Sequence, residues 1–469
     1  ASMLAIEFHA SMMDKVIQEI EKRRDGYVDE LAEFLAIPSV STDPEHAADV
    51  RRCAEYCRDA LGKIGFPVTE VHETPGHPIV TADWTGAEGA PTVLFYGHYD
   101  VQPVDPVELW TTPPFEATVR DGRIYGRGSA DDKGQVLCHW KAWEAHFAAH
   151  GKLPCNVKVL LEGEEEIGSE HLAPFIADNR ERLANDVVLI SDSPMFARGV
   201  PSLCYGLRGL CYMEIHVRGA KSDLHSGSFG GAVANPAQAL ARILSGLKDH
   251  EHHVAIEGFY DKVRPVSERE RAEFGRLPFN EIEFRHQLEV PELVGEAGFT
   301  TLERIWARPT LDVNGMISGF TGKGAKTVLP GVASAKVSMR LVPDQDPDEI
   351  AELFRRHVES HAPPGVTVRV ENLHGARPYI APLDHPANRA AARALGRAFA
   401  ADPVFTREGG SIPVTVTFQE ELGTTSILMG FGLPDENAHA PDEHLDLENF
   451  HGGVVTAAWF YEEYARNGK

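Results

Sequence analysis

The chain has 469 residues, of which 43% are hydrophobic and 25% are charged, a composition typical of globular proteins rather than disordered ones. This length exceeds the roughly 250–300 residues at which a single hydrophobic core stops growing, so more than one domain is expected. The 70 acidic residues outnumber the 45 basic ones, and the formal net charge of −25 disfavours nucleic acid as a partner.

The sequence carries no sign of membrane insertion or secretion. The longest apolar runs, at 93–96 and 187–190, are far shorter than the ~20 residues that a membrane span requires. The N-terminal residues lack the basic-then-apolar order of a signal peptide. Six cysteines in so long a chain do not indicate a disulfide framework. We therefore expect a soluble, cytoplasmic protein with no membrane partner.

The first and last parts of the chain show an α/β pattern. Amphipathic helices are predicted over 14–34 and 47–64. Four nearly continuous apolar runs are typical of strands buried on both faces of a mainly parallel sheet, and they lie at 92–96, 157–161, 187–190 and 426–429. Further helices are predicted around these strands, at 134–149, 170–183 and 386–400.

The middle of the chain has a different order, strand–helix–strand–strand–helix–strand, which is typical of a small open sheet with helices on one face. These elements are expected at 211–217, 236–247, 311–317, 333–341, 347–361 and 367–372. A charged segment at 251–309 carries no recognisable motif. The expected fold class is α/β, with a mainly parallel-sheet domain of residues 1–208 and 385–469 interrupted by an inserted α+β domain of residues 209–384.

Polar residues follow each buried strand of the first domain. His98 and Asp100 follow the first strand, a run of glutamates ends the second at 162–166, Asp192 follows the third, and His439 comes after the fourth. Because the carboxyl ends of parallel strands meet at one edge of a sheet, these side chains are expected to cluster. So many carboxylates in one place would repel each other unless cations neutralise them.

This edge of the sheet suits two divalent metal ions. The predicted ligands are His98, Asp131 and Asp192 for one ion, and Asp131, Glu166 and His439 for the other. Imidazole and carboxylate donors favour Zn²⁺ and are compatible with Mn²⁺ or Co²⁺. Asp100 would fix the tautomer of the His98 ring. Glu165, next to a ligand, would stay free to accept a proton from water.

Each of these residues also has an ordinary structural interpretation. A lone histidine after a strand is more often a surface or core residue than a ligand. A run of glutamates is typical of a solvated face, and Asp131 and Asp132 could simply cap the helix that follows them. The repetition of one ligand chemistry at four strand ends favours the metal site. Three consecutive glutamates at 164–166 leave open a shift of base and ligand by one position.

Several motifs resemble those of the co-catalytic zinc metallopeptidases, peptidase family M20, which includes carnosinase, cytosolic nonspecific dipeptidase, carboxypeptidase G and aminoacylase. They are GHYDVQP at 97–103, GRGSADDKG at 126–134, EGEEEIGS at 162–169, SDS at 191–193 and the late His439. The resemblance covers nearly the whole chain. It is strongest to the carnosinase and cytosolic dipeptidase branch, through SDLHSG at 222–227, KTVLPGVASAKVSMRLVPDQDP at 326–347 and EGGSIPV at 408–414.

The resemblance implies a two-zinc catalytic domain and an inserted lid domain through which two copies of the chain form a homodimer. It implies that Asp131 bridges the metals and that the peptide bond between Asp131 and Asp132 is cis. It also implies that Glu165 activates a metal-bridging water. His225 would act in trans, holding the scissile carbonyl oxygen in the partner's site. The residues implied in substrate binding are Arg340, Ser411 and Thr327, which would hold the C-terminal carboxylate, and His374.

The function expected is metal-dependent hydrolysis of peptide bonds in dipeptides or short peptides with a free C-terminal carboxylate. The first alternative is an N-acyl-amino-acid amidohydrolase that uses the same two metals and Arg340. The second is a non-catalytic binding protein of the same fold. For two residues the simpler structural interpretations stay open at this point: a salt bridge for Arg340 and no role at all for His225.

Overall fold

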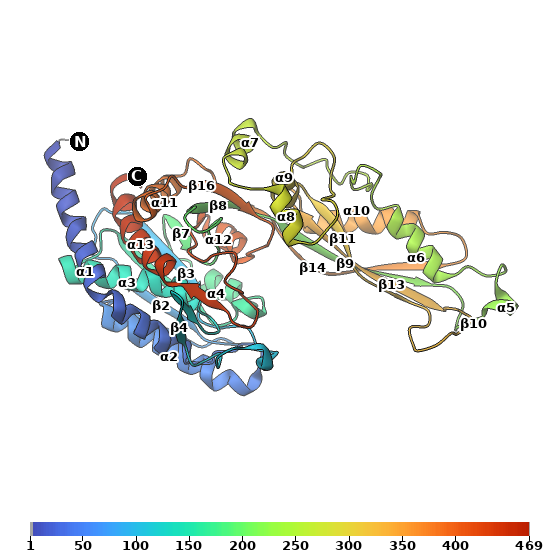
Figure 1. Cartoon of the computed structure of the whole chain (residues 1–469), viewed down its shortest axis with the longest axis horizontal. Helices are drawn as coiled ribbons and strands as arrows, with labels where there is room; N and C mark the ends of the chain where they lie inside the picture. Colours follow the sequence, from blue (N-terminus) through green and yellow to red (C-terminus); the bar gives the residue numbers. More distant parts are fainter. Residues whose placement is uncertain (1–2, 469) are drawn as a thin grey trace. The chain divides into compact units, whose positions relative to one another are not determined.

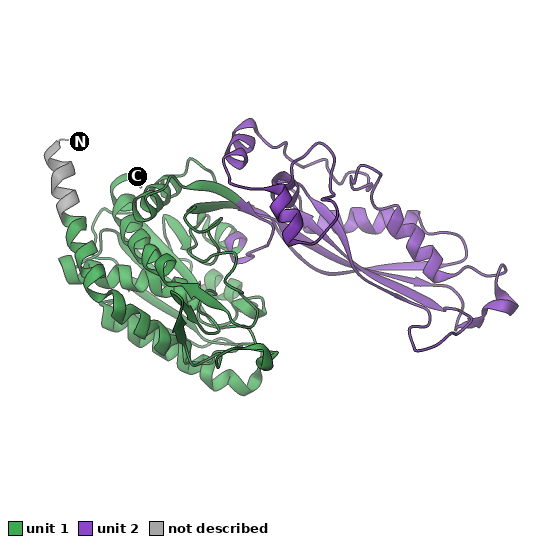
Figure 2. Ribbon diagram, viewed as in Figure 1, with its two compact units in different colours: residues 1–205, 381–406, 417–469 green, residues 206–380, 407–416 purple. Residues whose placement is uncertain are grey.

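The computed structural model describes residues 3–468, with side chains from residue 12 onward (Figure 1). The chain divides into two compact units (Figure 2). Unit 1 contains the residues up to 205, residues 381–406 and those from 417 onward, whereas unit 2 contains residues 206–380 and 407–416. The chain therefore passes between the units four times, and the short segment 407–416 returns to unit 2.

A large sheet forms the centre of unit 1. Its strands follow the order β1-β2-β6-β3-β7-β17-β8-β15, with β16 beside β8. The strands are β1 (Val68–His72), β2 (Ile79–Trp84), β3 (Thr92–His98), β6 (Asn156–Glu162), β7 (Val187–Ile190), β8 (Ser202–Leu207), β15 (Tyr379–Ile380), β16 (Val404–Glu408) and β17 (Ser426–Leu428). The neighbours β6, β3, β7 and β17 pair in parallel, and the pairs that flank them are antiparallel.

The central strands are buried along almost their whole length, since every residue of β7 and most residues of β3 and β6 are inaccessible to solvent. Such burial on both faces explains their continuous apolar sequences. The parallel centre of this sheet, with helices packed around it, confirms the predicted α/β class. A small second sheet, in the order β18-β5-β4, was not predicted and is built from β4 (Thr118–Arg120), β5 (Arg123–Tyr125) and β18 (His444–Asp446).

Helices pack around this sheet and form much of the core of unit 1. α1 and α13 both pack on α3, α11 packs on α13, and α2 packs on β1 and β2. The helices are α1 (Met3–Leu35), α2 (Ala47–Ile64), α3 (Lys133–His150), α4 (Leu172–Asp178), α11 (Pro386–Phe399), α12 (Val414–Leu422) and α13 (Leu447–Asn467). α4 is shorter than the helix predicted over 170–183. No helix among the described residues has the length and apolar character needed to cross a membrane.

Unit 2 is built on a four-stranded antiparallel sheet in the order β11-β13-β9-β14. Its strands and paired helices are β9 (Gly209–Arg218), α6 (Pro236–Ser245), β11 (Thr310–Ser318), β13 (Val332–Leu341), α10 (Pro347–Ser360) and β14 (Thr367–Ala376). This is the predicted βαββαβ order. The remaining elements are β10 (Leu224–His225), α5 (Ser226–Phe229), α7 (Glu268–Gly275), α8 (Glu281–Gln287), α9 (Thr301–Trp306) and β12 (Val328–Leu329).

The sheet of unit 2 has one face covered by α6 and α10. Alternate residues of β9 and β13 are buried against these helices, because successive side chains of a strand point to opposite faces. Arg340 lies between the buried Met339 and Leu341 and therefore belongs to the opposite face. Tyr212 and His374 share this second face, since they are directly paired across β9 and β14.

We predict that the folded state of unit 1 loses stability in acid because of His146, a residue of α3. This side chain is buried, its Nε2 lies 3.1 Å from the carbonyl oxygen of Ala458, and burial lowers its pKa from 6.5 to about 4. Below pH 6.5 the unfolded chain therefore takes up a proton that the native chain does not, so stability present at neutral pH is lost. Between pH 7 and pH 4, we expect the free energy of unfolding of the wild type to fall by about 3 kcal/mol more than that of His146→Gln.

The measurement is urea unfolding followed by circular dichroism at several pH values. Gln keeps a donor for the Ala458 carbonyl but has no proton to gain. His250→Gln, which removes an exposed histidine of unit 2, is the matched control and is expected to keep the wild-type pH dependence. Parallel pH profiles for His146→Gln and the wild type would contradict the prediction.

Candidate metal centre and active site

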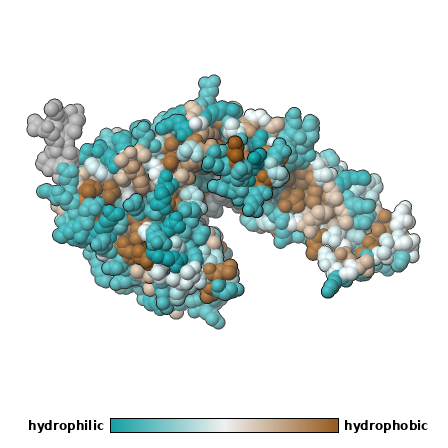
Figure 3. All heavy atoms as spheres, in the orientation of Figure 1, coloured by the Kyte–Doolittle hydropathy of each residue, from teal (hydrophilic) through white to brown (hydrophobic). Residues whose placement is uncertain are grey.

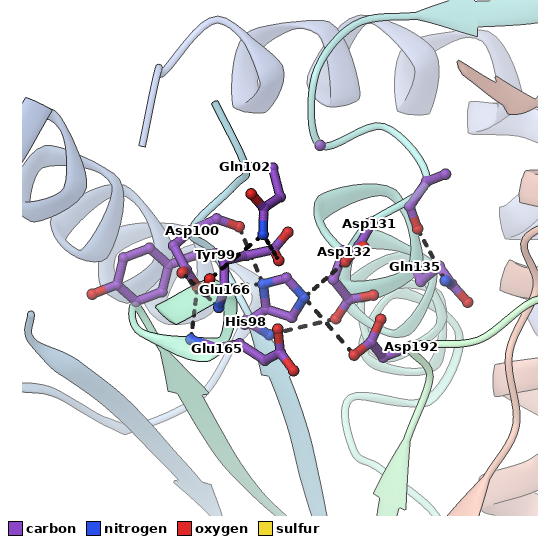
Figure 4. Close-up of polar contacts among 12 residues, drawn as sticks. His98, Tyr99, Asp100, Gln102, Asp131, Asp132, Gln135, Glu165, Glu166 and Asp192 are labelled. Atoms are coloured by element: carbon purple, nitrogen blue, oxygen red, sulfur yellow. Dashed lines mark hydrogen bonds and ion pairs between the residues drawn. The ribbon is translucent and has the colours of Figure 1, made fainter. Parts of the chain in front are cut away.

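A cluster of two histidines and several carboxylates lies at the carboxyl ends of the parallel strands of unit 1, and Figure 4 shows His98 with the carboxylates around it. His98 is the last residue of β3, and Asp192 follows β7 by one residue. Asp131 comes from the turn before α3, Glu166 from the short helical turn after β6, and His439 from the segment between β17 and β18. Four strand ends therefore contribute to one place, as predicted.

Asp131 lies between the two histidines. Its Oδ1 is 3.0 Å from Nε2 of His98, and its Oδ2 is 2.9 Å from Nε2 of His439. Glu166 lies on the His439 side, with 3.3 Å between Oε2 and Nε2, and Asp192 lies on the His98 side, with 3.9 Å between Oδ2 and Nε2. The aspartate is thus placed to serve two adjacent ligand groups with one oxygen each.

The acidic side chains of this cluster would be stabilised by bound cations. Burial, with further help from Asp131, raises the pKa of Asp192 to about 7. Hydrogen bonds to Asp131 and Glu166 raise the pKa of His439 to about 10. Both shifts favour the protonated forms of these side chains, as expected where acidic groups lie close together. Divalent ions would displace those protons, because metal ligands must be deprotonated.

The donor set fits two divalent ions. Two groups among the described residues bring their ligand atoms within 4.8 Å of one another: His98, Asp132 and Asp192, and Asp131, Glu166 and His439. Within the described chain, the buried Oε1 of Glu166 and the buried Oδ1 of Asp132 have no hydrogen-bond partner. Such orphaned oxygens among imidazoles are what a metal site requires. The second group is the predicted ligand set of the second ion.

Asp132 enters the first group although it was not predicted. Its Oδ2 accepts a hydrogen bond of 3.4 Å from the backbone N–H of His98, and the peptide bond that joins it to Asp131 is cis, as the family resemblance implies. Asp131 nevertheless stays the carboxylate nearest to His98.

Asp100 connects the His98 ring to the glutamates after β6. Its Oδ1 lies 3.3 Å from Nδ1 of His98, and its two oxygens accept hydrogen bonds from the backbone N–H groups of Glu165 and Glu166 at 3.3 and 3.1 Å. The carboxylate is fully buried. Asp100 thus orients a ligand and the segment that carries the expected base, as an outer partner of a metal site does.

The three consecutive glutamates have different surroundings. Glu164 accepts hydrogen bonds from the backbone N–H of His77 and from His171, and so lies outside the ligand groups. Glu166 faces His439, and Gln102 donates to its Oε2 at 2.7 Å. Glu165 belongs to neither ligand group, and burial raises the pKa of its carboxyl well above the usual range. A carboxylate of raised pKa beside the cluster is suited to proton transfer.

Glu443 holds the turn that carries Asp131, although no motif pointed to it. Its Oε1 accepts from the backbone N–H groups of Ala130 and Asp131 at 3.0 and 3.1 Å, and its Oε2 accepts from that of Gly128 at 3.0 Å. Nη1 of Arg127 donates to the same Oε2 at 2.6 Å, and both side chains are only 1% exposed. This pair fixes the backbone on which the shared ligand depends.

Removing the charge of Glu443 is therefore expected to weaken metal binding. Gln offers a single neutral acceptor oxygen, so Glu443→Gln removes the acceptor for some of these backbone N–H groups and the negative charge beside Arg127. We expect a 10- to 100-fold loss of metal affinity, measured by competition with a chelating dye, together with a lower thermal midpoint. Glu448→Gln, an exposed position nearby, should change neither. Metal affinity within twofold of the wild type would contradict a positioning role.

The five other predicted residues lie in unit 2 and form separate groups. Nη1 of Arg340 donates to Oγ of Ser411 at 3.4 Å. His374 packs edge-on against Tyr212, with ring centroids 5.3 Å apart. His225 and Thr327 lie together at the β10–β12 pair, where the backbone N–H of Ser226 donates to the carbonyl of Thr327 at 3.1 Å. His225 and Thr327 are exposed.

These groups occupy opposite ends of the sheet of unit 2. Arg340 pairs with Leu210 near the start of β9, whereas β10 follows the other end of β9 at Arg218 (Figure 1). The eight residue steps from Leu210 to Arg218 span roughly 26 Å in an extended strand. Within unit 2, His225 and Thr327 are therefore remote from Arg340 and Ser411.

The chain is similar over nearly its full length to known peptidases. The chain is 34% identical to the "Cys-Gly metallodipeptidase dug1" of Schizosaccharomyces pombe over 97% of this chain and 98% of the relative. It is 32% identical to the human "Beta-Ala-His dipeptidase" over 97% and 93% of the two chains. The solved structure of the di-peptidase Dug1p from Saccharomyces cerevisiae matches with a TM-score of 0.80 and 32% identity, over 97% of this chain and 99% of that one. The sequence profile of "Peptidase family M20/M25/M40" matches residues 94–463, and the chain therefore belongs to this family.

Proposed function

We propose that this protein hydrolyses the peptide bond of dipeptides or short peptides that carry a free C-terminal carboxylate, in a reaction that depends on divalent metal ions. The observation that carries the proposal is Asp131 between His98 and His439, with Glu165 free beside them. Full-length similarity to metallodipeptidases supports a peptide rather than another substrate.

The metal ions are proposed to be Zn²⁺. His98, Asp131 and Asp192 would hold one ion, and Asp131, Glu166 and His439 the other. Mixed imidazole and carboxylate donors suit Zn²⁺, and Mn²⁺ or Co²⁺ would fit the same set. When bound, the ions would polarise the scissile carbonyl and make water acidic enough to react near neutral pH.

The residues of the chain would then divide the remaining work. Glu165 accepts the proton of the attacking water and returns it to the leaving amine, for which its raised pKa suits it. Asp100 keeps the His98 ring in one orientation. Arg340 and Ser411 hold the C-terminal carboxylate of the substrate, and His374 lies on the same sheet face as Arg340.

His225 and Thr327 are proposed to act in a second subunit of a homodimer. Both are exposed, and both lie at the end of the sheet of unit 2 that is remote from Arg340. A residue at that end would complete a site more readily in another copy of the chain. In that site, His225 would stabilise the negative charge that develops on the carbonyl oxygen, and Thr327 would contact the carboxylate.

The domain roles follow from this arrangement. Residues 1–208 and 385–469 would form the catalytic domain, and residues 209–384 the lid domain through which the subunits associate. A cytoplasmic location is proposed because all six cysteines are buried and none forms a disulfide, as is usual for proteins of a reducing compartment.

Mixing two inactive variants tests the dimer. Glu165→Ala keeps His225, and His225→Ala keeps Glu165, so a mixed dimer regains one complete site. Random mixing is expected to restore about a quarter of wild-type turnover. Two different affinity tags would isolate the mixed dimers. Mixed dimers without activity would contradict the action of His225 in trans, and mixing two preparations of His225→Ala provides the blank.

The function itself is tested with chelator-treated protein to which Zn²⁺, Mn²⁺ or Co²⁺ is returned. We expect metal-dependent cleavage of free dipeptides such as Cys-Gly and Ala-Ala, and no cleavage of their N-acetylated forms. Cleavage only of N-acyl amino acids would make the protein an amidohydrolase with the same centre. Two bound metals with no turnover on either panel would favour a binding protein of this fold.

A further inference from the structure

A buried arginine that the proposed mechanism does not use lies at the junction of β8 and β9. Arg208 is only 9% exposed. Its Nε donates to the carbonyl of Gly409 at 3.3 Å, and its own carbonyl accepts from Oγ of Ser411 at 2.7 Å. The side chain therefore lies against the 409–411 segment, the same segment that Arg340 contacts through Ser411.

Arg208 has no anionic partner in the described part of the chain. Its Nη1 is buried and makes no hydrogen bond there, and no carboxylate of residues 12–468 lies within 4.0 Å of Arg208 or Arg340. The neighbouring Glu408 contributes only its backbone carbonyl, which accepts from the N–H of Arg208 at 3.2 Å. A buried guanidinium without an anion is unfavourable, so its retention points to a ligand.

Two like charges near each other strengthen this argument. Burial, and then the charge of Arg340, lower the pKa of Arg208 to about 10, and Asp312 opposes this effect in part. Asp312 itself lies 3.6 Å from Lys248. An anion bound between the two arginines would relieve their repulsion.

Two glycines of the 409–411 segment leave the surroundings of Arg208 free of side chains of their own. A side chain at Gly409 would place its Cβ 2.9 Å from Nη2 of Arg208, so only glycine lets the guanidinium approach this backbone. At Gly410 a Cβ would meet no atom within 4 Å, which leaves open space next to the segment. Gly409 therefore keeps a side chain away from Arg208, and Gly410 leaves open space beside the same segment.

We propose that Arg208 is a second guanidinium for the C-terminal carboxylate of the substrate and, with Arg340, sets the requirement for a free carboxylate. A carboxylate accepts several charge-assisted hydrogen bonds, and two arginines can satisfy both of its oxygens. This inference rests on the proposed function, since it assigns a further residue to the same substrate group.

Kinetics with matched substrates test the assignment. The metal-loaded enzyme is assayed on a dipeptide and on the same dipeptide with a C-terminal amide. Arg208→Gln is expected to lower kcat/KM for the free dipeptide about 10- to 100-fold, mainly through KM, and to leave that for the amide nearly unchanged. A ratio of the two kcat/KM values within twofold of the wild type would overturn the proposal.

Two further variants guard against a purely structural effect. Arg208→Lys keeps the charge but not the planar guanidinium, so the variant should fold. Its ratio of the two kcat/KM values should lie between those of the wild type and Arg208→Gln. If Arg208→Gln does not fold, Arg208→Lys decides: an unchanged ratio overturns the proposal. Arg242→Gln removes an exposed arginine of the same unit and should keep the wild-type ratio.

Anion binding separates this inference from the proposed function. Acetate is titrated into the metal-loaded protein at constant ionic strength, and the thermal midpoint is followed. The wild type and Arg242→Gln should be stabilised more than Arg208→Gln and Arg340→Gln. If the protein gave this result but cleaved no dipeptide, the anion site would be supported and the proposed function would be contradicted. Equal stabilisation of all four proteins would overturn the site even if dipeptides are cleaved.

Discussion

Glu165→Gln is expected to lower kcat on dipeptides by about 10³-fold or more while both metal ions stay bound. Gln has the size of Glu but cannot accept the proton of the attacking water. Glu165 belongs to neither group of ligand atoms, so its replacement leaves both groups intact. The measurements are kcat at saturating dipeptide and metal content by mass spectrometry. Loss of a metal ion in this variant would make Glu165 a ligand rather than the base.

Two control variants show whether the base is placed at the right one of three glutamates. Glu164 bonds to His77 and His171 outside the cluster, so Glu164→Gln should reduce stability and change kcat less than tenfold. Glu170→Gln, at an exposed position of the same segment, should change neither quantity. A larger loss of kcat in Glu164→Gln than in Glu165→Gln would shift the assignment by one residue.

The position of the cluster could be predicted because it depends on a short-range rule. His98, Glu166 and Asp192 lie at or shortly after the end of a buried apolar strand, and parallel strands bring those ends to one edge. Asp131 could be placed there through its turn, but its position between two histidines depends on His439, which is 308 residues away. Contacts over such distances leave no periodic pattern in the sequence.

Support for the cluster could not be predicted for the same reason. Glu443 reaches the turn of Asp131 across 312 residues, and a single buried acid in a loop looks like any surface acid in a sequence. Asp132 was interpreted as part of a helix start, whereas its side chain faces His98. Only the directions of side chains reveal these roles.

In unit 2, two short helices could have been predicted from the sequence, whereas the assignment of one segment to this unit could not. Segment 251–309 contains two capping boxes, at Ser267–Glu270 and Thr300–Glu303, and both begin short helices. This spacing of Ser or Thr three residues before Glu is visible in a sequence. In contrast, residues 407–416 belong to unit 2 through contacts with Arg208 and Arg340, which local pattern does not show.

Asp131→Asn is expected to lose affinity for both metal ions, whereas His439→Ala should mainly weaken one. Asp131 places one oxygen 3.0 Å from His98 and the other 2.9 Å from His439, and an Asn amide offers one neutral oxygen in place of this bridging carboxylate. Turnover should fall by about 10³-fold or more. Metal content after dialysis against buffered free metal, with activity at rising metal concentration, measures the effect.

The pattern of metal loss decides whether Asp131 is shared. If Asp131 bridges the two ions, Asp131→Asn removes a ligand from both of them, whereas His439→Ala removes a ligand from one. A bridging carboxylate therefore predicts loss of both ions in Asp131→Asn and loss of one in His439→Ala. Loss of a single ion in Asp131→Asn would assign the residue to one metal and contradict the bridge. Asp121→Asn is the matched control, since Asp121 is exposed and its φ of 50° suits Asn equally well. It should keep both ions and wild-type turnover, so that any loss at position 131 is attributable to the bridging oxygens.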